Sequence, residues 1–345
     1  MPRIHPHLPY EVIQSEVLPR LPAKSIGRFR CVCKAWNSFL STPDFARMHL
    51  RYQTNYKLLL LDLLSPTFRT LDHEPMNHDS ITTTRPIPFK KHDVSIIASL
   101  DGLVCVCLEK TRELAFWNPL TGAYKKIRTS FFNDISCGAL AFYNDSSNDY
   151  KLLHVVSEGA FIYSRRLDSW RKINTSFESY DISNFVWSMT TFVGDKVYFK
   201  LHSKSTRGLW CLMCFDVECE KFKEIQFPPI PCGAHLRVNL AALDGCIHLC
   251  VACGETFKDL ECDMWRMDGD GWVKVAEIAI PHWKPFREIY TKKNGNWLAI
   301  CKDGNCVKNI GFEDFATDFY AYFVGHSTHL YHQEVYIETL VSPNP

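Results

Sequence analysis

The chain has 345 residues, of which 46% are hydrophobic and 22% are charged. A chain of this length exceeds the usual size of a single core, so two folding units are expected. Lys and Arg number 39 against 38 Asp and Glu, a formal net charge of +1. That balance excludes a general attraction of the whole chain to nucleic acid or to acidic membranes.

The cellular compartment is predicted from two absences. The segment before Pro9 contains no apolar run typical of a signal peptide. The most hydrophobic window, residues 58–64, is too short to span a bilayer and contains Asp62. We therefore expect a location in the cytoplasm and/or the nucleus, where the 15 cysteines would be mostly free thiols.

The first fifty residues have the apolar spacing of short helices. Pro9 suits the first turn of a helix, because its missing N–H would be unpaired there in any case. Apolar residues then recur at four-residue intervals, namely Ile13, Val17 and Leu21. A second helix is predicted from about residue 24 and a third up to residues 42–43, with Phe29 and Phe39 facing the internal core. Three such helices make a marginal domain, so a partner is expected to cover the remaining apolar face.

After about residue 56 the pattern changes to short strands separated by turns. The turn signals are Asp101-Gly102, Gly194-Asp195 and Asp244-Gly245. A second signature, an aromatic residue followed by a charged pair and an aliphatic one or a close variant, begins at Tyr124, Trp170, Phe222 and Trp272. Its period of roughly 50 residues is that of a propeller blade and predicts about six blades. The run Glu334–Val341 is predicted to pair with the first strand.

The predicted fold class is therefore multidomain. A small all-α region of three helices occupies residues 1–50, a short linker residues 51–56, and a mainly antiparallel all-β, propeller-like domain residues 57–343.

The opening region resembles the F-box of plant F-box proteins. The resemblance is carried by Leu8-Pro9, by residues 17–25 and 28–36, and by Pro43-Asp44-Phe45. It implies a three-helix F-box that docks on the Skp-type adaptor of an SCF (cullin–RING) ubiquitin ligase. Carried over by position, the adaptor-binding residues are Leu8, Pro9, Ile13, Val17, Leu18, Leu21, Pro22, Ile26, Val32 and Trp36. An apolar stripe on so short a domain fits docking of a helix in a groove.

Two residues depart from that family pattern. Pro19 stands where relatives commonly have another residue, and it should end the first helix early because its ring clashes with the carbonyl group of Ser15. Gly27 stands where a leucine is common, which lowers helix propensity and removes an apolar anchor. Both changes predict an adaptor affinity below that of typical relatives.

The remainder resembles the F-box-associated interaction domain of the same family. The segments that carry the resemblance are Ser99–Cys105, Trp117–Gly122 with Tyr124-Lys125-Lys126, and Val335–Pro343. A kelch-like propeller is the related expectation for this domain. The chain contains no Gly-Gly pair, however, so the kelch motif itself does not support that label. By analogy this domain binds the target protein, and the binding residues are expected on loops at one face. The sequence does not identify them.

Four other patterns resemble chemical sites in part. Gly325–His329 lacks the second glycine of a nucleophile elbow. The pairs Cys211/Cys214 and Cys250/Cys253 have zinc-like spacing but lie in predicted strands, where such side chains point to opposite faces. Asp268–Gly271 is typical of a hairpin turn rather than of a calcium loop. We therefore predict no catalytic residue, no metal site and no cofactor.

A basic cluster lies in the predicted helical region. It comprises Arg20, Lys24, Arg28, Arg30 and Lys34. A solvated face or a complement to an acidic adaptor is favoured over a nucleic-acid site.

The resemblance implies the substrate-recognition subunit of an SCF-type E3 ubiquitin ligase. Its partners would be a Skp-type adaptor, through it a cullin–RING ligase, and an unidentified target protein. The alternatives are an F-box scaffold that holds a partner without ubiquitinating it, and an enzyme with a site in the propeller channel.

Overall fold

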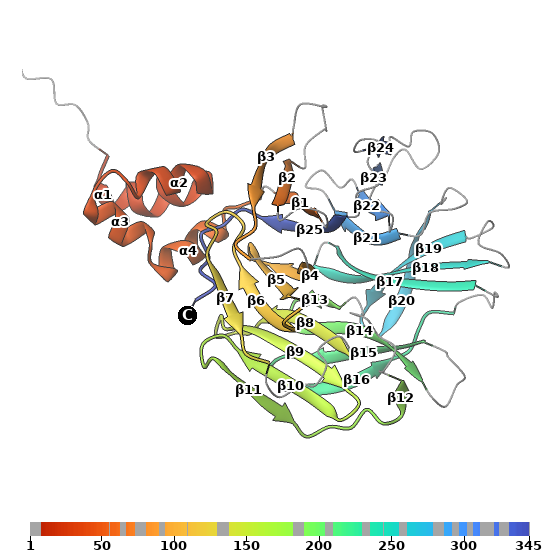
Figure 1. Ribbon diagram of the computed structural model, residues 1–345. Coiled ribbons are helices and arrows are strands. Elements are labelled where there is room, and N and C mark those ends of the chain that lie inside the picture. Colours follow the sequence, from red (N-terminus) through yellow and green to blue (C-terminus); the bar gives the residue numbers. More distant parts are fainter. Residues whose placement is uncertain are drawn as a thin grey trace, which may run out of the picture. The chain divides into compact units, whose positions relative to one another are not determined.

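A computed structural model describes residues 8–54, 56–62, 67–72, 81–89, 94–108, 110–129, 138–181, 190–203, 210–229, 235–243, 245–254, 261–278, 286–291, 297–301, 306–310, 321–323 and 331–344. The chain forms two compact units. The first contains residues 1–128 and 333–345, and the second contains residues 129–332. Helices gather at the start of the first unit, and strands make up the rest of both (Figure 1).

The helical region contains four α-helices within residues 8–54: α1 (Tyr10–Val12), α2 (Ala23–Phe29), α3 (Lys34–Leu40) and α4 (Pro43–Leu50). The sequence predicted three. The additional helix α4 begins at the residue pair where the third predicted helix was expected to end. There the hydroxyl of Thr42 accepts a hydrogen bond from the backbone N–H of Phe45 at 3.2 Å, and Pro43 occupies the first helical position. The same Thr-Pro step thus ends α3 and caps α4.

Pro19 ends the first helix early, as predicted. Regular α-helix stops at Val12 and is followed by a π-helical segment η1 (Ile13–Val17) and a 3-10 segment η2 (Leu18–Arg20). The backbone N–H of Leu18 donates to the carbonyl oxygen of Ile13. A π turn widens the backbone just ahead of the proline, whose ring would otherwise meet the carbonyl group four residues earlier.

The first unit contains two antiparallel sheets. One has the order β25-β1-β2-β3, and the other has the order β4-β5-β6-β7. Their strands are β1 (Tyr56–Asp62), β2 (Thr67–Asp72), β3 (Ile81–Pro86), β4 (Val94–Leu100), β5 (Leu103–Leu108), β6 (Glu113–Trp117), β7 (Tyr124–Ile127) and β25 (Tyr331–Ile337). Figure 1 shows β25, drawn in blue, beside the orange β1. The predicted pairing of the last strand with the first is confirmed.

The second unit continues the pattern with four further sheets. Three have four strands each, and the fourth places β13 beside β14 in addition to the order β12-β14-β15-β16. The strands are β8 (Ala139–Asn144), β9 (Tyr150–Val156), β10 (Gly159–Ser164), β11 (Ser169–Ile173), β12 (Tyr180–Asp181), β13 (Thr191–Val193), β14 (Lys196–Ser203), β15 (Trp210–Asp216), β16 (Lys221–Ile225), β17 (His235–Leu243), β18 (Cys246–Gly254), β19 (Glu261–Asp268), β20 (Gly271–Ile278), β21 (Phe286–Thr291), β22 (Trp297–Cys301), β23 (Cys306–Ile310), β24 (Ala321–Phe323).

The repeated aromatic signature marks the last strand of a sheet. Tyr124, Trp170, Phe222 and Trp272 lie on β7, β11, β16 and β20, respectively, and each of those strands is the final one of its sheet. Within the described residues the sheets number six, in agreement with the number of blades that the spacing predicted. The fold is therefore an F-box-like helical region followed by propeller-like antiparallel sheets.

Three of the segments that carry the family resemblance meet in the first unit. The side-chain amide of Asn118 donates hydrogen bonds to the carbonyl oxygens of Thr339 (3.0 Å) and Val341 (2.8 Å). The hydroxyl of Thr339 donates to the carbonyl oxygen of Asp101 at 2.7 Å. Gly102 has a φ of +81°, and a Cβ built there would lie 2.4 Å from the carbonyl oxygen of Ile337. The β4–β5 turn, the β6–β7 turn and the C-terminal segment are thus packed against one another.

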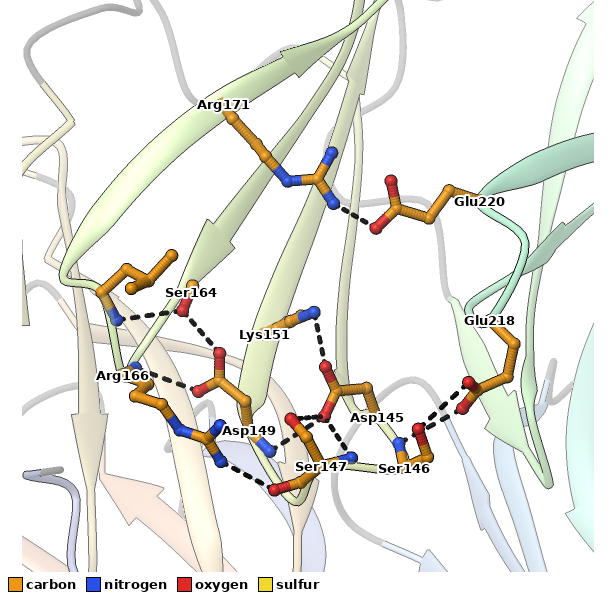
Figure 2. Close-up of polar contacts among 11 residues, drawn as sticks. Asp145, Ser146, Ser147, Asp149, Lys151, Ser164, Arg166, Arg171, Glu218 and Glu220 are labelled. Atoms are coloured by element: carbon orange, nitrogen blue, oxygen red, sulfur yellow. Dashed lines mark hydrogen bonds and ion pairs between the residues drawn. The ribbon is translucent and has the colours of Figure 1, made fainter.

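A polar network ties two consecutive sheets of the second unit together (Figure 2). Ser146, in the β8–β9 turn, donates its backbone N–H (3.2 Å) and its hydroxyl (3.0 Å) to the carboxylate of Glu218. In the same turn, burial opposes ionisation of Asp145, but hydrogen bonds from Lys151 and Ser147 outweigh it and lower its pKa to about 2. Because these groups satisfy one another, the network acts as a scaffold for the turn.

Candidate adaptor-docking surface

The helical region has a small closed core. Its buried members are Leu18, Ala23, Ile26, Leu40, Phe45 and Ala46, together with Leu340 from the C-terminal segment. Phe29 and Phe39 pack against it, as predicted, and make edge-on ring contacts with Trp36 (5.4 Å) and Phe45 (5.2 Å). Aromatic pairs at these distances add to the stability supplied by burial alone.

Polar side chains fix the connections between the helices. Arg30 donates from Nε and Nη2 to the carbonyl oxygen of Leu40, at 3.1 and 2.6 Å, and so joins α2 to the end of α3. A ring nitrogen of the buried His49 lies 2.8 Å from the carbonyl oxygen of Leu21. Burial lowers the pKa of His49, which favours the neutral ring in this contact. The loop that precedes α2 is therefore held by α4.

The predicted docking residues divide into three groups by exposure. The exposed ones are Leu8 (58%), Val17 (41%) and Val32 (65%), together with Pro9 and Pro22. Ile13, Leu21 and Trp36 are half-buried against the helical core. Leu18 (2% exposed) and Ile26 (0%) are members of that core.

The burial of Leu18 and Ile26 corrects their predicted placement on the docking face. In this conformation they cannot touch a partner, because the other helices and Leu340 enclose them. A four-residue period does not separate inner from outer positions where a π turn rotates the helix, as it does just before Leu18. Two exposed residues were missing from the predicted set: Tyr10 (45%) and Val12 (36%). Tyr10 and Val12 lie one and three residues after Pro9, and that proximity to a predicted docking residue could have indicated their exposure.

Exposed apolar side chains concentrate in this region. Among residues with described side chains, nine large hydrophobic residues are exposed, and six of them lie between residues 8 and 52. We call Leu8, Tyr10, Val12, Val17 and Val32 the apolar ridge. Because single exposed hydrophobic residues are ordinary, it is their concentration within one short region that marks a surface for a partner.

Three cations of the predicted basic cluster interact with different partners within the chain. Arg20 pairs with Glu16 at 3.0 Å and lies 4.5 Å over the ring of Tyr52. Lys24 pairs with Glu338 at 3.4 Å. Arg30 is occupied by a backbone carbonyl group. With these cations committed to separate partners, an extended track for a nucleic-acid backbone is not favoured.

Gly27 is predicted to weaken α2, and the structure offers a direct test. A Cβ built on Gly27 meets nothing within 4 Å. Gly27→Ala should therefore raise the free energy of unfolding by about 0.5–1 kcal/mol, because glycine loses more backbone entropy than alanine in a helix. Urea unfolding of the purified protein measures the change. Gly122→Ala is the matched control, since that site is equally open but has a φ of +74°. A stabilised Gly122→Ala, or a destabilised Gly27→Ala, would contradict the reasoning.

The patterns weighed as chemical sites have structural roles where they are described. Cys211 and Cys214 lie on β15, and Cys250 and Cys253 lie on β18, as predicted. Burial raises the pKa of Cys250 to about 12, so its thiol is a poor source of the thiolate that zinc requires. Asp268 pairs with Gly271 across the β19–β20 hairpin, which confirms the predicted turn.

Among the described residues there is neither a metal-binding cluster nor a membrane-spanning helix. They include no group of three or more His, Cys, Asp or Glu residues arranged to hold a metal ion. None of the helices described has the length and apolar character needed to cross a membrane. The segment Gly325–His329 lies outside the described residues.

Comparison with known proteins finds two family models in this chain, whose boundary differs from that between the two compact units. The F-box domain model matches residues 6–48, and the model of the F-box associated beta propeller domain matches residues 52–341. An F-box/kelch-repeat protein of Arabidopsis thaliana is 27% identical over 380 residues, covering 98% of this chain and 97% of the relative. An F-box protein of the same plant is 25% identical, covering 99% and 93%.

Similar solved structures resemble the chain only distantly. The virginiamycin B lyase of Staphylococcus aureus superposes with a TM-score of 0.45 and 12% identity, covering 79% of this chain and 90% of the lyase. We draw no functional conclusion from it. The family models together span almost the whole sequence. The chain belongs to the family of F-box proteins that carry an F-box domain at the N-terminus followed by an F-box-associated β-propeller domain.

Proposed function

We propose that this protein is the substrate-recognition subunit of an SCF-type (cullin–RING) E3 ubiquitin ligase. In this role the F-box docks on a Skp-type adaptor, and the propeller domain holds a target protein for ubiquitination. The observation that carries the proposal is the apolar ridge, which remains exposed on a helical region whose own core is already closed. Membership of the family supports the same role.

The proposed mechanism is positional. The receptor contributes no reacting group. It raises the local concentration of the target near the conjugating enzyme that carries ubiquitin. A rigid F-box suits that task, and the hydrogen bonds from Arg30 and His49 across the helices provide rigidity. We place the protein in the cytoplasm and/or the nucleus, where such ligases would meet their targets and where its cysteines would stay reduced.

The adaptor interaction is tested by placing charges on the ridge. Leu8→Asp combined with Val17→Asp should lower the affinity for a purified Skp-type adaptor by at least about 100-fold, because each anchor of an apolar interface is worth about 2 kcal/mol. Isothermal titration calorimetry measures the affinity. Both side chains are exposed, so the thermal unfolding midpoint should change little.

The matched control is Val273→Asp, because Val273 on β20 is 45% exposed and Val17 is 41% exposed. Its adaptor affinity should equal that of the unmodified protein. An unchanged affinity in the double variant would refute docking through the ridge.

Ligase function is tested separately from docking. Proteins captured from source tissue with the proteasome blocked should have half-lives that lengthen when cullin activity is inhibited. If the half-lives of the captured partners do not depend on cullin activity, the protein is instead a scaffold that holds a partner without ubiquitinating it.

A further inference from the structure

A pocket of about 470 Å³ lies within the first compact unit. Its wall is formed by α2, the end of β3, the β6–β7 turn and the C-terminal segment. Its lining includes Lys24, Gly27, Arg28, Arg30, Arg85 and Thr121. A volume of this size is within the range of small-molecule sites.

The lining of the pocket is strongly cationic. It includes Lys24, Arg28, Arg30 and Arg85, and it includes no acidic side chain. The acid beside it, Glu338, is shared between Lys24 (3.4 Å) and Lys57 (3.5 Å). Four cationic residues around one concavity raise its positive potential, which favours an anion there.

Two of these cations are available to a ligand. Within the part of the chain that the structure describes, Arg28 and Arg85 have neither a hydrogen-bond partner nor an ion-pair partner. Arg28 comes from α2 and Arg85 from β3, beside Phe68 of β2. A ligand that met both guanidinium groups would be held from two separate elements.

Arg30 supplies a charge that is fixed in place. Its two hydrogen bonds to the carbonyl oxygen of Leu40 hold the guanidinium group in one position, and Arg30 is half-buried. Burial lowers the pKa of Arg30, which means that its charge is incompletely solvated. An anion nearby would replace the lost hydration, and little side-chain freedom would be lost on binding.

Gly27 keeps the pocket open. It lines the wall, and a Cβ built on it would meet nothing within 4 Å. Any larger side chain at this position would begin to fill the space that a ligand needs. The residue that weakens α2 is therefore also one that leaves room beside Arg28.

We propose that this pocket is a binding site for a small phosphate-bearing anion, held by Arg28 and Arg85 with Lys24 and Arg30 adding positive charge. Guanidinium groups bind oxyanions through paired hydrogen bonds, and a phosphate group offers several cations more negative charge and more acceptor oxygens than a single carboxylate or a halide does. The volume exceeds that of one phosphate group, so the ligand is expected to carry a second phosphate or a small organic part. Bound there, it would bridge the F-box and the first sheet.

The test uses the full-length protein and pyrophosphate as the probe. Pyrophosphate should raise the thermal unfolding midpoint more than sodium chloride does at equal ionic strength, because a ligand that binds only the folded state stabilises it. Calorimetry should give one site per chain. Arg28→Ala and Arg85→Ala should each weaken binding by about tenfold or more, since each removes charge-assisted hydrogen bonds.

Two further variants separate a built pocket from general positive charge. Gly27→Leu should abolish binding although it removes no charge, and its midpoint without ligand shows that it is folded. Arg51→Ala removes an exposed arginine outside the pocket lining and should leave affinity unchanged. The proposal is wrong if chloride stabilises as much as pyrophosphate, if Arg51→Ala weakens binding as much as Arg85→Ala, or if Gly27→Leu still binds. Binding of a phosphopeptide but not of pyrophosphate would also overturn it.

Discussion

Asn118→Ala should lower the free energy of unfolding of this protein by about 3–4 kcal/mol, since removal of a buried hydrogen-bonding group leaves its former partners unsatisfied at about 1–3 kcal/mol each. Asn118 is 0% exposed. Its amide nitrogen donates to the carbonyl oxygens of Thr339 and Val341, and its Oδ1 accepts from the backbone N–H groups of Leu120 (2.9 Å) and Thr121 (3.1 Å). One side chain thus closes its own turn and anchors the C-terminal segment.

The variant Asn118→Asp separates the role of Asn118 in its own turn from its role in anchoring the C-terminal segment. Asn118→Asp keeps an acceptor for the turn but loses both donors, so it should release the C-terminal segment while the turn persists. Limited proteolysis should then cut the chain after residue 337 faster than in the unmodified protein. Asn174→Ala, at an exposed position, is the control and should be neutral. A protease-resistant C-terminal segment in Asn118→Asp would contradict the assigned role.

Lys200→Met should raise the free energy of unfolding at pH 7 by about 2–3 kcal/mol. Lys200 lies on β14, is 8% exposed, and donates to the carbonyl oxygen of Val238. Burial lowers the pKa of Lys200 from 10.5 to about 8. That difference of 2.5 units corresponds to roughly 3 kcal/mol, which the folded state loses by burying the charged amine.

The lowered pKa of Lys200 makes the free energy of unfolding depend on pH. Below pH 8 the lysine is protonated in both states, and the folded state bears the full cost. Between pH 8 and 10.5 the unfolded chain binds a proton that the folded chain does not, so stability rises with pH. Lys200→Met should remove that rise, measured as the difference between the two proteins in urea unfolding.

Lys196→Met on the same strand is the control for Lys200. The hydrogen bond from Lys196 to Asp195 raises the pKa of Lys196 above 10.5, so both states keep this proton at about pH 8–9, where the rise caused by Lys200 begins. Removal of Lys196 should leave the rise intact. A Lys200→Met protein that is less stable at pH 7 would show that the hydrogen bond to Val238 outweighs the burial of charge.

The repeating parts of this fold were predictable from the sequence. The aromatic signature located the last strand of four sheets, because the same side chains must pack at the same place in each repeat. The pairing of β25 with β1 was also predictable, because an apolar run near the C-terminus needs a neighbouring strand.

The composition of the docking surface was only partly predictable. Val17 and Leu18 are adjacent and both apolar, yet one is exposed and the other is buried. The chain passes through a π turn just before Leu18 and Pro19, and regular helical periodicity does not represent such a turn. Likewise, Leu340 completes the core around Ile26 from more than three hundred residues away, a contact that local patterns do not indicate.

The contribution of Leu340 has a consequence for synthesis. A ribosome releases the F-box helices early, but their core gains Leu340 only after that residue has emerged. Strand β1 likewise gains its pairing with β25 only at that stage. A polypeptide that ended before β25 would lack both, and its unfinished first unit would expose apolar surface to chaperones and proteases.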